Sequence, residues 1–168
     1  MKTKNIVVSG IIGILVLGTF IYLARPTGEN GTAAKTPVIP GAVALAAEKT
    51  FYDFGSISMA AGNVSQMFKV RNTGSEPIEI EKMYTSCMCT TASMMLDGKK
   101  FGPYGMPGHG FAPSMNQKMM PDEEAEVEVI FDPAAHGPSG VGRIDRTVFI
   151  ENSAGGPLQL SFSAMVTP

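Results

Sequence analysis

The clearest signal in the sequence is an alternation of apolar and polar residues that runs through its last two thirds. Phe68 and Val70 alternate with Lys69 and Arg71, and over residues 124–129 apolar side chains alternate with glutamates. A period of two is typical of a strand with one buried face. Similar runs, bounded by turn residues, lie at 51–54, 78–82, 144–150 and 158–166.

These runs predict an all-β domain, since no part of it has a sustained helical period. We expect an immunoglobulin-like antiparallel β-sandwich of about seven strands. The Asn72–Gly74 turn predicts that the runs at 64–71 and 78–82 pair as a hairpin. The sandwich would be a divergent one, because the chain has no tryptophan and two cysteines that are too close to bridge two sheets.

The N-terminus carries a different signal, an 18-residue run without charge at 6–23. Such a helix would span about 27 Å, close to the hydrocarbon core of a bilayer. Lys2 and Lys4 precede the run and only Arg25 follows it closely, which predicts a cytoplasmic N-terminus at 1–5 and a transmembrane signal anchor at 6–24. The domain would then be extracytoplasmic, either periplasmic or extracellular. A cleaved signal peptide is the alternative, although Tyr22 before Ala24 fits a cleavage site poorly.

Residues 25–47 are rich in Pro, Gly, Ala and Thr, and we interpret them as a flexible linker to a single domain at 48–168. The formal net charge is −2 and the isoelectric point is near 5.7. These values give no electrostatic support for nucleic-acid binding. We therefore expect contact with the membrane through the N-terminal helix and with no nucleic acid.

Three motifs occur in order in the first half of the domain: Asp53-Phe54-Gly55, then Phe68-x-Val70-x-Asn72-Thr73-Gly74, then Ser86-Cys87-x-Cys89-Thr90. Together they resemble the DUF1573 family, and the resemblance extends from about 50 to 166. It implies an exported bacterial domain, similar in fold to major-sperm-protein and PapD-like domains, and it implies no particular reaction. Two departures are Met88, where the family usually has glycine, and a longer connection at 91–120.

That connection lies in a segment, 83–120, that holds eight of the twelve methionines. Its glycines and prolines predict an irregular insertion. Thiolate, thioether and imidazole groups form a soft ligand set, which suggests a Cu(I) site made of Cys87, Cys89, Met88, Met106 and His109. The alternative is that the methionines pack as gap fillers, in which case no cofactor is expected. Zinc is disfavoured because four good ligands are not evident, and His136 has no ligand partner in sequence.

Export permits a disulfide between Cys87 and Cys89, the only two cysteines of the chain. In an extended strand the two side chains would project from the same face, and a disulfide between them would close a small ring that is easily reduced. This points to thiol redox chemistry. Against it, no helix N-terminus or neighbouring base is predicted beside either thiol.

Other catalytic signals are weak. The glutamates of 124–128 follow a strand period and indicate a solvated face, and the serines have no recognisable nucleophile motif. We therefore expect no enzyme but a membrane-anchored, non-catalytic binding or assembly module, which contacts an envelope protein through sheet edges and the Met-rich segment. A Cu(I)-binding domain is the alternative, and a thiol redox protein is the second.

Overall fold

The computed structural model describes residues 45–109 and 113–168, which form ten strands rather than about seven. The predicted membrane anchor and most of the predicted linker lie outside these residues. Within the ranges just given, the structure has no helix with the length and apolar character that a membrane crossing would need. The strands are β1 Leu45–Ala47, β2 Phe51–Ser58, β3 Val64–Asn72, β4 Ile78–Thr85, β5 Thr90–Leu96, β6 Lys99–Tyr104, β7 Gln117–Met119, β8 Glu124–Phe131, β9 Gly142–Asn152 and β10 Gly155–Thr167.

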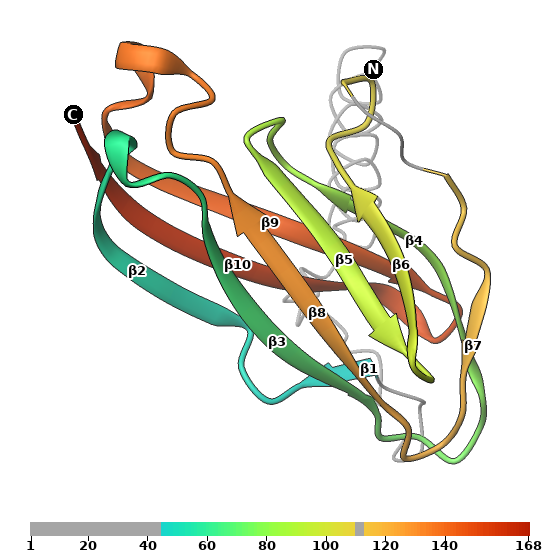
Figure 1. The fold of residues 1–168 in the computed structure, drawn as a ribbon. Coiled ribbons are helices and arrows are strands. Elements are labelled where there is room, and N and C mark those ends of the chain that lie inside the picture. The colour runs from blue at the N-terminus through green and yellow to red at the C-terminus, as the bar shows by residue number, and fades with distance from the viewer. Residues whose placement is uncertain (1–44, 110–112) are drawn as a thin grey trace, which may run out of the picture. The chain divides into compact units, whose positions relative to one another are not determined.

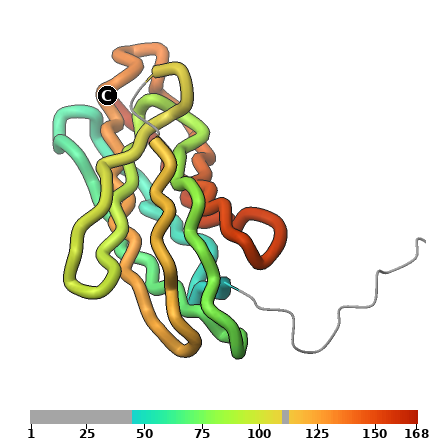
Figure 2. The backbone as a smooth tube through the Cα atoms, turned by 90° about the vertical axis from the view of Figure 1, so that its right-hand side faces the viewer, coloured from blue at the N-terminus to red at the C-terminus, as the bar shows by residue number. Residues whose placement is uncertain are grey.

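The ten strands form two five-stranded sheets, which confirms the two-sheet sandwich. The strand order is β1-β3-β8-β5-β6 in one sheet and β2-β10-β9-β4-β7 in the other. Every pairing is antiparallel except that of β2 with β10, which is parallel. Figure 1 shows the two layers, with β3, β8 and β5 in front of β9 and β10. In Figure 1 and in Figure 2 the loop after β8, drawn in orange, lies at the same end of the sandwich as the C-terminus.

The predicted alternation places the core as expected. In β8, Ala125, Val127 and Val129 are buried while Glu124 and Glu126 are exposed. The largest fully buried side chains come from both sheets, and each contributes roughly 1.5–3 kcal/mol by leaving water. The methionines within them, Met83, Met94 and Met119, are gap fillers of this core and not members of a surface loop.

The predicted hairpin between 64–71 and 78–82 is wrong, because β3 and β4 belong to different sheets. The connection between them is organised by Asn72, which is fully buried. Its side-chain amide donates to the carbonyls of Glu76 and Met119 at 2.9 and 3.0 Å, and its carbonyl oxygen accepts the Gly74 N–H at 3.0 Å. One side chain thus turns the chain from one sheet into the other.

The segment 91–120 is also more regular than the sequence predicted, since it contains β6, β7 and most of β5. The reason is the Asp97-Gly98 pair, whose φ angles of 49° and 70° form a tight two-residue turn between β5 and β6. Positive φ at both positions is what an antiparallel hairpin with the usual strand twist requires. This turn gives a β5–β6 hairpin where we expected an irregular insertion.

Replacing Asn72 by alanine removes hydrogen bonds from two carbonyls and one N–H in the buried connection. We expect the Asn72→Ala variant to lose about 2–4 kcal/mol of unfolding free energy, measured by urea denaturation of the full chain in detergent. Asn63, which is exposed, provides the matched control. An Asn63→Ala variant that lost as much stability as Asn72→Ala would contradict this account.

Candidate thiol site

The two cysteines lie in a four-residue turn between β4 and β5. The Thr90 N–H donates to the Cys87 carbonyl at 3.2 Å, so Cys87 opens the turn and Cys89 is its third residue. The pair therefore does not lie in the extended backbone that the sequence suggested. Met88 occupies the outer corner of the turn, where its side chain is 55% exposed.

Hydrogen bonds to both neighbouring strands hold this turn in place. The buried hydroxyl of Thr85 lies 2.9 Å from the Cys87 carbonyl and 3.0 Å from that of Thr90. Ser86 exchanges two hydrogen bonds with the backbone of Thr147 in β9, each of 2.9 Å. The position of the cysteines is thus determined by both sheets.

Cys87 and Cys89 form a disulfide, with their Cα atoms 5.3 Å apart. The surroundings of the two residues differ, because Cys89 is only 3% exposed whereas Cys87 is partly buried. An attacking group from solvent therefore reaches Cys87 more easily than Cys89.

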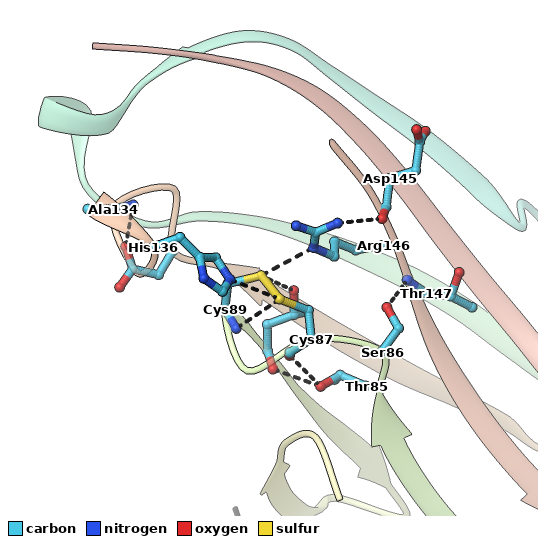
Figure 3. Close-up of a disulfide and its surroundings, with 11 residues drawn as sticks. Thr85, Ser86, Cys87, Cys89, Ala134, His136, Asp145, Arg146 and Thr147 are labelled. Carbon is cyan, nitrogen blue, oxygen red and sulfur yellow. Dashed lines mark hydrogen bonds between the residues drawn. A yellow bond between two sulfur atoms is a disulfide. The ribbon is translucent and has the colours of Figure 1, made fainter. Parts of the chain in front are cut away.

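His136 lies beside the outer sulfur, with its Nε2 atom 3.2 Å from Cys87 Sγ (Figure 3). The loop that carries it is held at two points. Asp132 accepts the Ala134 N–H at 2.8 Å, and the Ser139 hydroxyl donates to the His136 carbonyl at 2.7 Å. A side chain at Gly140 would come within 3.1 Å of the His136 Cβ atom, so glycine lets the loop close around the histidine.

Arg146 in β9 lies beside the inner sulfur. Its Nε–H donates to Cys89 Sγ at 3.3 Å, and its Nη1 donates to the Asp145 carbonyl at 2.8 Å, as Figure 3 shows. A guanidinium stays charged at all physiological pH values and stabilises negative charge on a neighbouring atom. Negative charge that develops on the Cys89 sulfur is thus compensated at once.

The pairing of β5 with β8 explains why His136 reaches the cysteines. Thr90 lies opposite Phe131, so the residues before Thr90 lie next to those after Phe131. The Asp132 N–H accordingly donates to the Cys89 carbonyl at 2.9 Å. The loop at 132–141 then begins at the thiol turn.

The structure therefore brings together a different set of residues from the one predicted. Among the described His, Cys, Asp and Glu residues, Cys87, Cys89 and His136 form a group whose ligand atoms all lie within 4.8 Å of one another, and His109 is not a member. His109 is exposed and Met106 is partly buried, both in the segment after β6. His136 and Arg146 were missed as site residues, and only knowledge of the strand pairing would have found them.

An open hollow of about 510 Å³ borders the site. His136 and Arg146 line it on the side of the disulfide, and Val141 and Arg143 contribute exposed side chains. The lining also includes Asp145, whose carboxylate lies 3.7 Å from Arg143, so the surface combines charged and apolar groups and suits a protein segment better than a small apolar ligand.

The fold and this turn define an immunoglobulin-like β-sandwich with a Cys-x-Cys turn at one end. Residues 45–102 match the model of the family described as "Protein of unknown function (DUF1573)", which confirms the resemblance over the first half of the domain. A search of the curated proteins gave no match.

Several solved structures are similar to this chain. A protein of unknown function from Porphyromonas gingivalis W83 has a TM-score of 0.54 at 14% identity, covering 78% of this chain and 51% of that one, so the present chain spans about half of its length. The VesB protease of Vibrio cholerae has a TM-score of 0.45 at 15% identity, covering 74% and 32%. The PapD-like domain 7 of human CEP192 has a TM-score of 0.47 at 13% identity, and the match covers 79% of this chain and 92% of that one. At 14% identity the first structure shows a shared fold and nothing about function, and the other two, with TM-scores below 0.5, carry no argument.

The difference in exposure predicts different thiol reactivity. We compare the Cys89→Ser variant, which keeps the Cys87 thiol, with Cys87→Ser, which keeps the Cys89 thiol. Alkylation by iodoacetamide, followed by intact-mass spectrometry, is expected to be roughly tenfold faster for Cys87, because the burial of Cys89 restricts access by more than the thiolate-favouring contact with Arg146 offsets. Equal rates in the two folded variants would contradict the assigned burial.

Proposed function

We propose that this chain is a membrane-anchored, extracytoplasmic binding module of the cell envelope that exchanges its Cys87–Cys89 disulfide with thiols of a partner protein. One observation carries the proposal: the two sulfurs have unequal surroundings. Cys87 lies near the surface beside His136, and Cys89 is buried against Arg146. The objection that neither thiol has a basic neighbour no longer holds.

The location rests on the sequence. The uncharged run at 6–23, with lysines before it, would place the domain outside the cytoplasm. Disulfides persist in such compartments, where the cytoplasmic reductants are absent. The part of the predicted 25–47 linker that precedes β1 would give the domain reach from the membrane to a neighbouring protein.

The first step is attack of a partner thiolate on Cys87 Sγ. A new S–S bond forms between the partner sulfur and Cys87, the bond between Cys87 and Cys89 breaks, and its electron pair leaves on Cys89 Sγ. Arg146 donates to that sulfur at 3.3 Å and stabilises the thiolate as it forms. Attack at Cys89 would face burial and would leave the charge on the sulfur farther from the guanidinium.

A second thiolate of the partner then attacks the partner sulfur that is bonded to Cys87, and Cys87 leaves as a thiolate beside His136. In balance, the partner dithiol loses two electrons and two protons and becomes a disulfide. Cys87 and Cys89 gain these two electrons and two protons and become a dithiol. One molecule performs one exchange, so the module acts stoichiometrically and needs no further catalytic group.

The hollow beside the site offers a binding surface for the partner. Its exposed Val141 and Arg143 flank His136 and Arg146, so a segment bound there would carry its thiol to the edge of the disulfide. Open sheet edges offer additional backbone contacts, because β1 covers only the last three residues of β3.

Arg146 can be tested against a matched neighbour. We expect Arg146→Met to slow the reaction of the disulfide with a small thiol such as dithiothreitol by about tenfold, because a charge-assisted contact to the leaving sulfur is lost. Arg143→Met removes the same charge from the same hollow without touching a sulfur, and it should change the rate less than about twofold. Equal effects of the two substitutions, in variants with unchanged circular dichroism, would show a general charge effect instead.

The partner can be trapped through the intermediate. In cells that express the full chain, the Cys87 thiolate of Cys89→Ser attacks the disulfide of an oxidised partner molecule, and one partner sulfur leaves as a thiolate. Alkylation of free thiols at lysis then stops that thiolate from releasing Cys87, so the mixed disulfide is kept. A reducible adduct of higher mass, seen on non-reducing gels with Cys89→Ser and at a much lower level with Cys87→Ser, is the expected result. A stronger adduct with Cys87→Ser would mean that Cys89 is the exchanging residue, which would contradict the proposed order of steps.

A further inference from the structure

The thiol turn and the loop after β8 bring three metal-ligand atoms together. The two cysteine sulfurs and a ring nitrogen of His136 all lie within 4.8 Å of one another. Nε2 of His136 is 3.2 Å from the nearer sulfur. Because the three atoms already converge, small movements would let them surround a single ion once the disulfide is reduced.

We propose that the reduced Cys87–Cys89 pair and His136 form a binding site for one Cu(I) ion. Two thiolates and an imidazole are soft donors, which favour Cu(I) over Mg²⁺ or Ca²⁺. Structural zinc sites take four protein ligands, whereas the described group offers three. This ligand set differs from the one that the sequence suggested, because His136 takes the place of His109.

The charge of the site supports a monovalent ion. Two thiolates and one Cu(I) leave a net charge of −1 on the complex, and Arg146 lies 3.3 Å from the sulfur of Cys89. A buried or partly buried charge is favourable only where an opposite charge is close. The guanidinium supplies that charge and cannot itself act as a ligand, since it has no lone pair to donate.

The surroundings of the three ligands give an ion access from solvent and hold the backbone of the ligands in place. His136 is exposed and Cys87 is partly buried, so an ion reaches the group from solvent. The backbone around the ligands is already held, by Thr85 at the turn and by Ser139 at the histidine loop. Ligands held in place before binding lower the entropy that binding must remove.

In the envelope, the dithiol would arise by the exchange proposed above, so there the metal site rests on that function. In the test, the full chain in detergent is reduced chemically under nitrogen and freed of reductant, so the metal site and the exchange can fail separately. Cu(I) is then added in competition with the chelator bathocuproine disulfonate. We expect the chain to take up one Cu(I) in competition with the chelator. The Cys87→Ser, Cys89→Ser double variant should take up none.

The two histidines of the chain provide the decisive pair of variants. His136→Ala should weaken Cu(I) binding by at least roughly tenfold, as expected for loss of one of three ligands, and His109→Ala should leave it within about twofold. X-ray absorption of the copper complex should show two sulfur neighbours and one nitrogen neighbour. Unchanged affinity in His136→Ala would overturn the proposal, and so would equal weakening in His109→Ala or a copper complex with sulfur neighbours alone.

Discussion

The register of β8 between its two neighbours is the constraint on which the rest of the structure depends. Phe131, at the end of β8, lies opposite Val64 on one side and Thr90 on the other. This alignment buries one face of the central strand and places the chain after Phe131 beside the chain before Thr90. The hydrogen bond from Asp132 to the Cys89 carbonyl fixes the junction. A slip of one residue would turn the glutamates of β8 into the core and separate His136 from the cysteines.

Around this junction the two cysteines acquire different properties although they are one residue apart. One sulfur is near solvent and a histidine from the loop after β8, and the other is buried against an arginine of β9, which belongs to the other sheet than β8. The same arrangement suits two states of the pair. In the proposed exchange it would direct attack to Cys87, and after reduction it would present three converging soft ligands to the proposed copper ion. The proposed exchange and the proposed copper site are thus consequences of one geometry.

Much of the fold could be predicted from local patterns, because β8 and the β9–β10 hairpin follow a clear period of two and clear turn residues. The β5–β6 hairpin was missed although Asp97-Gly98 is a strong local signal, since the surrounding methionines and glycines suggested an irregular loop. The site was only half predictable. Cys87 and Cys89 stand out in the sequence, whereas His136 and Arg146 reach them through strand pairings across about 50 residues, which no local pattern reveals.

The contact between His136 and the thiol pair is the central claim, and the chain offers an internal comparison because it has two histidines. Nuclear magnetic resonance of the full chain in detergent, with selective carbon labelling of histidine, follows the ring signals of His109 and His136 before and after reduction of the disulfide. The account predicts that the ring signals of His136 shift on reduction while those of His109 do not. Unmoved His136 signals in a sample whose thiols are fully reduced would contradict it.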